Sequence, residues 1–319
     1  MAAPAAPFAL RRRHLGDRVG DRLLIGLAGG AALGAVLLVG LFAYELVYQA
    51  WPAITKLGFH FITGRVWNPV TNAFGALEFI YGTAVTSLIA VLIAGPLAIA
   101  IALFLTELAP RLLKGTIGTL VEMLAAIPSV VMGLWGIFVL GPIVRDHIGP
   151  ALKSVLGWTP FFKGTPQLTG YLTASLVLTI MVLPITASVA RELFRTVPQD
   201  LKEASLALGM TRWEMIRGVV LPYTRGGLVA AVILGLGRAI GEAIAVLQTI
   251  GGIGSLKLSL FASGDTIAAR IAAQYQGASG LQTNALVYLA LILLAISLAA
   301  NFAAQVIVKR FEFQRTGGS

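Results

Sequence analysis

Six long apolar runs divide the chain, and shorter segments rich in Pro, Trp, Arg, Lys and Asp separate them. The runs lie near residues 23–44, 79–105, 116–144, 170–190, 226–248 and 284–308. A helix that crosses about 30 Å of hydrocarbon needs about 20 predominantly apolar residues, and each run supplies that length. The apolar residues are continuous rather than alternating, unlike those of membrane β-barrel strands. The pattern predicts an all-α integral membrane protein with six transmembrane helices.

Prolines interrupt three of these runs. Pro96, Pro128 and Pro184 lie inside the second, third and fourth runs. Within a membrane, backbone groups that a proline leaves without partners must be satisfied by neighbouring helices, hydroxyl groups or a polar cavity. The third run also contains Gly133 and Gly136. We therefore expect the third span to be the least regular of the six.

The composition excludes a soluble globular protein. Hydrophobic residues make up 57% of the 319 residues and charged residues only 12%, whereas an ordinary globular chain has about 25% charged residues. The absence of cysteine excludes disulfides, thiol catalysis and thiolate metal sites. The three histidines are far apart in the sequence, so we expect no metal site.

The formal net charge of +10 would suggest an anionic partner in a soluble protein, but in a membrane protein the position of the charges matters more. Of the 24 Lys and Arg residues, 16 lie in the two tails, between the second and third runs and between the fourth and fifth. Seven lie in the other loops, and Arg238 lies inside a run. By the positive-inside rule, both termini are predicted to be cytoplasmic.

This distribution predicts one membrane domain with two short tails. We expect a basic cytoplasmic tail over 1–21, a six-span transmembrane domain over 22–312 and a cytoplasmic C-terminal tail over 313–319. The first run is longer than the roughly 7–15 apolar residues of a signal peptide, and no clear cleavage site follows it. We therefore interpret it as a retained membrane anchor.

The loop between the fourth and fifth runs has the pattern of two short helices. Pro198 can begin a helix, and Gly209 suits a helix end with a left-handed residue. Thr211 and Glu214 have the spacing of a capping box for a second helix, and Pro222 is expected to mark the boundary before the next span. Such a loop could be a structured connector, a DNA-binding helix-turn-helix or a docking element. Both of its ends enter the membrane within about ten residues and no third helix follows, which disfavours binding to nucleic acid.

Residues of this loop resemble the EAA loop of bacterial ABC importer permeases. The matching positions are Glu203, Ala204, Ser205, Gly209, Leu221 and Pro222, with Val219 and Val220 before the last two. The departures from that pattern are Ser205 for a second Ala and Val219 for Ile. The resemblance implies that the loop over 196–222 couples the chain to a separate ATPase subunit.

Three further segments, 74–83, 124–136 and 235–242, resemble the C-subunit family of Pst-type phosphate importer permeases. The likeness extends from about residue 20 to 312. It implies a six-helix fold of the type I ABC importer permease class in the bacterial inner membrane. It also implies a heterodimer with an A-type permease, two ATPase subunits, an external phosphate-binding protein, and inorganic phosphate as the transported ion.

Arg238 is a charged residue within the fifth run. Such a residue costs about 2.5–3.5 kcal/mol on insertion scales, so it should face protein or water. Glu242, four residues further on, is expected to share its helix face, and the two form either a structural ion pair or part of an anion site. A guanidinium suits bidentate binding of phosphate oxygens, and an anion would compete with Glu242 for it. Following the resemblance, we place Ser129 in the same substrate pathway.

The sequence lacks the motifs of an enzyme. There is no G-x-x-x-x-G-K-[ST], G-x-S-x-G or H-E-x-x-H. We expect a transporter subunit that has no ATPase site and binds no cofactor, with ATP and Mg²⁺ bound by the partner ATPases. The predicted function is that of one permease half of a phosphate importer. The alternatives are a permease for another oxyanion such as sulfate or molybdate, a membrane-anchored DNA-binding or signalling protein, and a channel.

Overall fold

The computed structural model describes residues 15–252 and 256–316. Contacts within the chain define two compact units, Met1–Tyr48 and Gln49–Ser319. The described part of the first unit belongs to helix α1 (Leu15–Leu57), and the last helix, α14, ends at Thr316. The predictions for residues 1–14 of the basic tail and for 317–319 lie outside the described residues.

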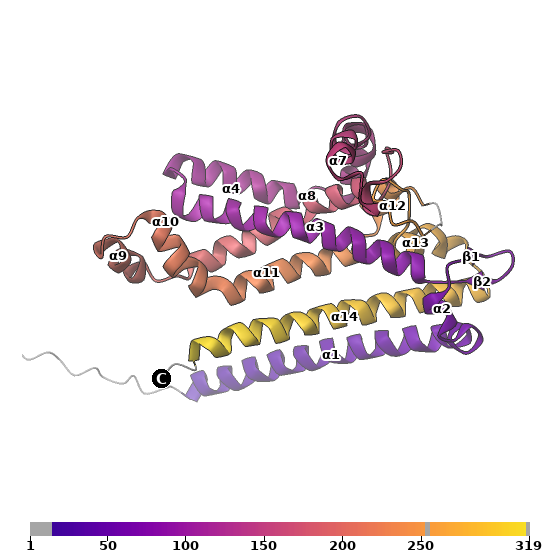
Figure 1. The fold of residues 1–319 in the computed structure, drawn as a ribbon. Helices are drawn as coiled ribbons and strands as arrows, with labels where there is room; N and C mark the ends of the chain where they lie inside the picture. Colours follow the sequence, from indigo (N-terminus) through magenta and orange to yellow (C-terminus); the bar gives the residue numbers. More distant parts are fainter. Residues whose placement is uncertain (1–14, 253–255, 317–319) are drawn as a thin grey trace, which may run out of the picture. The chain divides into compact units, whose positions relative to one another are not determined.

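The second unit contains the remaining helices and one small sheet (Figure 1). The antiparallel strands β1 (Trp67–Asn68) and β2 (Ala73–Phe74) place Trp67 opposite Phe74. The helices are α2 (His60–Thr63), α3 (Leu77–Leu103), α4 (Arg111–Ala125), α5 (Ser129–Trp135), α6 (Gly141–Ile143), α7 (Gly149–Leu156), α8 (Tyr171–Arg195), α9 (Gln199–Ala207), α10 (Arg212–Met215), α11 (Leu221–Gly241), α12 (Ile244–Ile250), α13 (Ile267–Gln274) and α14 (Leu281–Thr316). Short π-helical segments continue several of them, at Phe104–Leu108, Gly136–Leu140, Val144–Ile148 and Ile216–Val220. The 3₁₀ turns are Pro160–Phe162 and Tyr275–Gly277.

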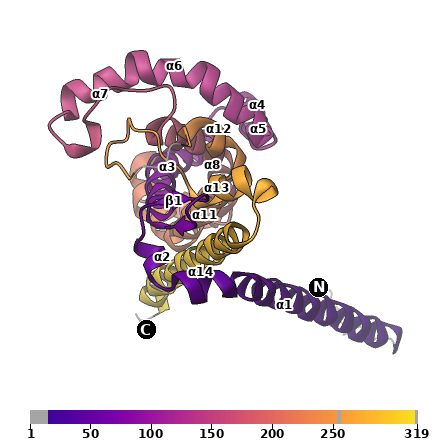
Figure 2. The same cartoon turned by 90° about the vertical axis from the view of Figure 1, so that its right-hand side faces the viewer.

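Helices α3, α8 and α11 form the centre of this unit. Helix α3 packs along α8, and α11 packs against both of them and against α14. Figure 1 shows α9 and α10 at one end of the bundle and α12, α13 and the strands at the other, and Figure 2 shows α4 to α7 as an arc along one side. Helix α3 approaches its neighbours closely because every fourth residue on one face is a fully buried alanine. These residues are Ala90, Ala94, Ala98 and Ala102.

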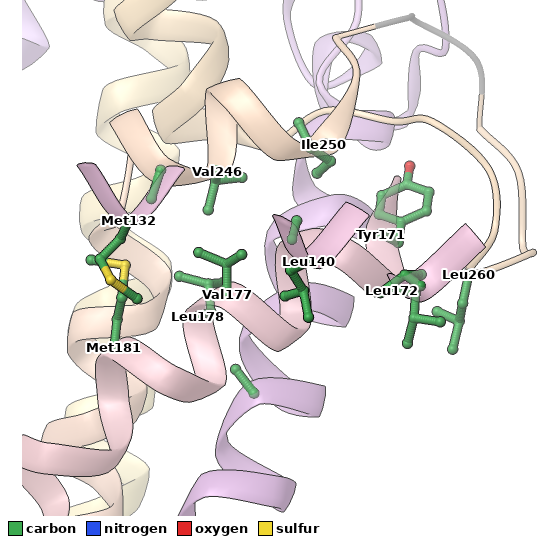
Figure 3. Packing of buried hydrophobic residues seen from close by; sticks show 14 of the residues in the cluster. Met132, Leu140, Tyr171, Leu172, Val177, Leu178, Met181, Val246, Ile250 and Leu260 are labelled. Carbon is green, nitrogen blue, oxygen red and sulfur yellow. The ribbon is translucent and has the colours of Figure 1, made fainter. Parts of the chain in front are cut away.

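The largest cluster of buried apolar residues joins α5, α8, α12 and the loop before α13. Figure 3 shows Met132 beside Met181 and Val246 facing Val177. Tyr171, at the start of α8, is fully buried. This cluster fixes α12 against the bundle, so the chain direction after α11 is set by packing.

The prediction of six spans is confirmed, although some boundaries differ. In the part of the chain that the structure describes, six helices are long and apolar enough to cross a membrane. They are Arg22–Leu57, Leu77–Leu108, Ser129–Leu156, Tyr171–Arg195, Arg212–Gly241 and Leu281–Ala303. The run predicted over 116–144 is broken, because α4 ends at Ala125 and Pro128 is extended (φ −59°, ψ 140°). A proline disfavours helical geometry in the residue before it. The second piece then continues past 144, because π-helical segments carry the helix through Pro142 and Pro150.

The fifth predicted span, 226–248, is wrong at both ends. It begins earlier, since the π-helical segment Ile216–Val220 joins α10 to α11 and the helix continues through Pro222. A π-helical turn accommodates a proline that lacks the backbone N–H of a regular turn. The helix ends at Gly241, where Glu242 is extended (φ −72°, ψ 118°), and α12 begins again at Ile244.

A buried ion pair fixes the loop after α12 to the start of α3. Arg270 Nη2 lies 2.7 Å from Asp265 Oδ2, and the Arg270 guanidinium covers the Phe79 ring at 4.9 Å. Thr83 Oγ1 accepts a hydrogen bond from the Ile267 backbone N–H at 3.0 Å. Burial raises the pKa of Asp265, although Arg270 and the Thr266 backbone act in the opposite direction. The Asp265 carboxylate therefore depends on these partners to remain charged.

Candidate functional site

Arg238 borders an open cavity of about 590 Å³ near the end of α11. The cavity lies among α8, α11 and α14, and its polar lining comes from Arg238, Glu242, Ser297 and Asn301. The arginine side chain is exposed in the isolated chain, and Glu242 is half-buried. An intramembrane arginine needs protein or water around it, and this cavity provides such an environment.

Two glycines of α11 keep this cavity open, and a third allows close packing. A Cβ atom added to Gly237 or Gly241 would meet no atom within 4 Å. A Cβ atom added to Gly235 would lie 2.6 Å from Thr186 Oγ1 and 2.7 Å from a Val182 methyl group. Gly235 therefore lets α11 approach α8, whereas the other two glycines leave free space beside Arg238.

The structure leaves the shared helix face of Arg238 and Glu242 a prediction but does not show an ion pair between them. Glu242 is the residue that follows the last helical residue, Gly241, and the chain leaves the helix there. Within residues 15–252 and 256–316, no salt bridge joins the two side chains. Glu242 Oε1 instead accepts a long hydrogen bond from the Ala245 backbone N–H at 3.5 Å. Both residues still line the same cavity, so the guanidinium is available to an anion in this conformation.

Ser129 lies outside the lining of this cavity. It begins α5 after the break at Pro128, and α5 packs against α12. Gly133 allows this contact, because an added Cβ atom would lie 3.0 Å from the Ala245 Cα. A role for Ser129 in the substrate pathway stays a prediction.

Ser297 and Asn301 are cavity residues that the sequence analysis missed. They lie four residues apart on α14 and therefore on one face of that helix. Two polar side chains at this spacing within an apolar run are a usable signal, since polar groups in spans face protein or a cavity. Only the packing of α14 on α11 shows that this face meets Arg238.

The loop between α8 and α11 has the predicted helix, turn and helix. Gly209 has a positive φ of 85° between α9 and α10, and Thr211 and Glu214 form the predicted capping box. Glu203, Ala204, Gly209 and Pro222 are exposed and Leu221 is half-buried. Ser205 is buried, and its hydroxyl donates to the Lys202 carbonyl at 2.7 Å.

Large apolar side chains also lie on the surface of this loop. Leu208 is 84% exposed and Trp213 is 64% exposed, and the exposed Leu206 and Met210 lie near them in sequence. Exposed apolar surface of this kind marks interaction sites.

One ion pair fastens α9 to the spans. Lys202 Nζ donates to Glu107 Oε1 at 2.7 Å, and the two side chains are only 11% and 10% exposed. Glu107 belongs to the π-helical segment that ends the α3 span. A second ion pair, between Arg191 and Glu122, joins α8 to α4. The Lys202–Glu107 pair is therefore a nearly buried contact between α9 and the end of the α3 span.

The chain matches a family of transport proteins and is similar to phosphate permeases of bacteria. Residues 94–313 match the model of the family described as "Binding-protein-dependent transport system inner membrane component". The chain is similar to "Phosphate transport system permease protein PstC" of Mesorhizobium japonicum, with 44% identity over 302 residues, 93% of this chain and 92% of the relative. The protein of the same name from Pasteurella multocida is 43% identical over 285 residues, 88% and 89% of the two chains.

The fold is also similar to that of a solved transporter. A structure of the inward-facing MetNI methionine ABC transporter matches with a TM-score of 0.57. The match covers 74% of this chain and 95% of that chain at 21% identity. This likeness concerns the fold alone.

Proposed function

Because the chain belongs to the family of binding-protein-dependent transport system inner membrane components, we propose that its Arg238 cavity is part of a pathway for inorganic phosphate. The chain is a multi-pass inner-membrane permease subunit of a phosphate importer. The observation that carries the proposal for the pathway is the placement of Arg238 at the end of α11, beside an open cavity with polar residues of two helices.

The cavity chemistry suits phosphate. Arg238 supplies a planar pair of donors for oxyanion oxygens, while Ser297 and Asn301 add neutral donors and acceptors. Glu242 supplies an acceptor-only carboxylate at the same cavity. A phosphate ion at neutral pH keeps at least one P–OH group that can donate to this carboxylate, whereas a sulfate ion has no proton to donate. The combination therefore favours phosphate over sulfate or molybdate.

The loop over 196–222 is proposed to couple this cavity to ATP hydrolysis in a separate subunit. Its exposed Leu208 and Trp213 provide apolar docking surface, next to the exposed Glu203 and Gly209. The helix is continuous from Arg212 to Gly241, so about 39 Å of helix, at about 1.5 Å per residue, joins α10 to Arg238. A shift of α10 would therefore displace Arg238 directly.

The remaining parts of the transporter follow from the same proposal. The relatives support a multi-subunit ABC importer with permease and ATPase partners. We propose an A-type permease as the other half of the pathway, two ATPase subunits that bind ATP and Mg²⁺, and an external phosphate-binding protein. In this arrangement the chain binds no cofactor, has no ATPase site and keeps both termini in the cytoplasm.

Uptake of labelled phosphate tests the proposal. Cells that lack their own permease of this kind would receive the wild-type chain or Arg238→Gln, with sulfate as a competitor. We expect uptake only with the wild-type chain, and resistance to sulfate. Equal uptake by both chains would leave Arg238 with a structural role, and uptake that sulfate suppresses would indicate a permease for another oxyanion.

A further inference from the structure

A second cavity, of about 530 Å³, lies beside the start of α9. Residues of the segment after α3, the first half of α4, the end of α8 and the start of α9 line it. Four of the lining residues are basic, and one is acidic. These are Lys114, Arg191, Arg195, Lys202 and Glu107. In the described part of the chain, this cavity shares no lining residue with the Arg238 cavity.

The four basic groups exceed by one the carboxylates that pair with them. Arg195 pairs with Glu192, which lies outside the cavity lining. Lys202 pairs with Glu107, and Lys114 Nζ donates to the Thr106 carbonyl at 2.6 Å. An ammonium has three donors, so Lys114 retains donors for another acceptor. Arg191 pairs with Glu122, which lies outside the cavity lining, and its buried Nε atom has no hydrogen-bond partner in the described part of the chain. Partly buried cations in excess of carboxylates favour a bound anion.

The start of α9 adds backbone donors to the same place. Pro198 and Gln199, the residues at which α9 begins, both line the cavity, and no side chain among the described residues caps the helix. The first backbone N–H groups of a helix carry partial positive charge and bind anions. The side-chain charges and the start of the helix thus both favour an anionic ligand.

We propose that this cavity binds a phosphate group, either of inorganic phosphate or of an anionic lipid. Ammonium and guanidinium groups from three helices can contact different oxygens of a tetrahedral group. The volume also admits a lipid headgroup, and the neighbouring Leu108 and Leu112 are exposed apolar residues suited to contact with acyl chains. An anion held there would connect α9 to α4 and α8 as well as to α3.

This site goes beyond the transport function proposed above, and its occupancy can be measured without transport or ATP hydrolysis. The full chain would carry Arg238→Gln in every sample, which removes the proposed transport site. In that background, Lys114→Gln/Arg195→Gln removes two charges from the cavity. Arg212→Gln/Arg217→Gln removes two exposed charges from α10 and the segment that follows it, outside the cavity lining, and is the matched control.

Two ligands distinguish the sources of the phosphate group. Inorganic phosphate would be titrated calorimetrically into the chain in phosphatidylcholine nanodiscs. Retention of phosphatidylglycerol would be measured by native mass spectrometry. We expect the cavity variant to bind one of these ligands at least about tenfold more weakly than the control. Loss of phosphate binding identifies the free ion, and loss of phosphatidylglycerol alone identifies the lipid.

A third variant makes the test independent of folding defects. Glu107→Gln removes the only carboxylate among the lining residues of the described chain and should tighten anion binding about tenfold. A misfolded protein would not show tighter binding. The proposal is overturned if the cavity variant and the control bind both ligands alike and Glu107→Gln tightens neither.

Discussion

Replacing Glu107 with Gln tests how α9 is held against the spans. In the wild-type chain, Lys202 Nζ donates to Glu107 Oε1 at 2.7 Å, and both side chains are about nine-tenths buried. The two residues are 95 positions apart in the sequence, so this contact depends on the tertiary structure. In the Glu107→Gln variant, Lys202 keeps an amide oxygen as acceptor but loses its counter-charge.

The expected loss of free energy is about 2 kcal/mol. Removing one partner of a fully buried ion pair costs about 3–5 kcal/mol, and a hydrogen bond to a charged group contributes about 1.5–3 kcal/mol. The variant retains a neutral hydrogen bond, and the pair is slightly exposed, so the lower part of these ranges applies. Since about 1.4 kcal/mol changes an equilibrium constant tenfold, the population with α9 detached should rise about 30-fold.

Hydrogen exchange of the full chain in nanodiscs measures this population. Peptides that cover α9 should exchange about 30-fold faster in Glu107→Gln, while those from the centre of α8 stay protected. Glu192→Gln is the control, because its partner Arg195 and Glu192 itself are 59% and 61% exposed and such pairs contribute about 0–1 kcal/mol. The reasoning would be refuted if α9 exchanged in Glu107→Gln at the wild-type rate. It would also be refuted if Glu107→Gln and Glu192→Gln accelerated exchange equally.

Three other predictions concern the loop over 196–222, the Arg238 cavity and the Asp265–Arg270 ion pair. Gly209→Ala places a Cβ atom on a residue with a φ of 85°, so it should cost about 1 kcal/mol of folding free energy and lower phosphate uptake without loss of membrane insertion. Gly209→Asp should uncouple uptake in the same way. Gly218→Ala is the control, because a Cβ atom there lies in open space, and it should transport normally. Glu242→Gln should let sulfate compete for phosphate uptake, because an amide also donates to a fully deprotonated oxyanion; undiminished selectivity would argue against a role for the carboxylate. Because burial raises the pKa of Asp265 above its ordinary value of 3.8, its contribution to stability is greatest below that value and declines as the pH rises through the raised pKa. The melting temperature of the wild-type chain should therefore have a decline with rising pH that Asp265→Asn lacks. Parallel curves of melting temperature against pH for the two chains would contradict this prediction.

The breaks in the spans show what the apolar pattern can and cannot predict. The interruption of the third run could be predicted from the sequence, because Pro128 lacks a backbone N–H and constrains the residue before it. The break at Glu242 was not visible, because the apolar residues continue on both sides of it. It depends on Val246 and Ile250, which pack α12 against the rest of the core. A boundary set by tertiary packing leaves no local signal.

The same distinction holds for the two sites. The capping box and the positive φ of Gly209 are local features, and the sequence predicted both. Ser297 and Asn301 join Arg238 only because α14 packs on α11. Lys202 finds Glu107 only through the packing of the α3 and α8 spans. These contacts link residues far apart in the chain, where the spacing of motifs carries no information.

Accumulation of phosphate by the reconstituted transporter tests the central claim most directly. The complex of this chain with its permease, ATPase and binding-protein partners would be placed in liposomes, and phosphate uptake and ATP hydrolysis would be measured together for the wild-type chain and Arg238→Gln. The account predicts that the variant still hydrolyses ATP, because the α9–α10 surface is unchanged, but accumulates no phosphate. Phosphate accumulation by Arg238→Gln at the wild-type rate would contradict it.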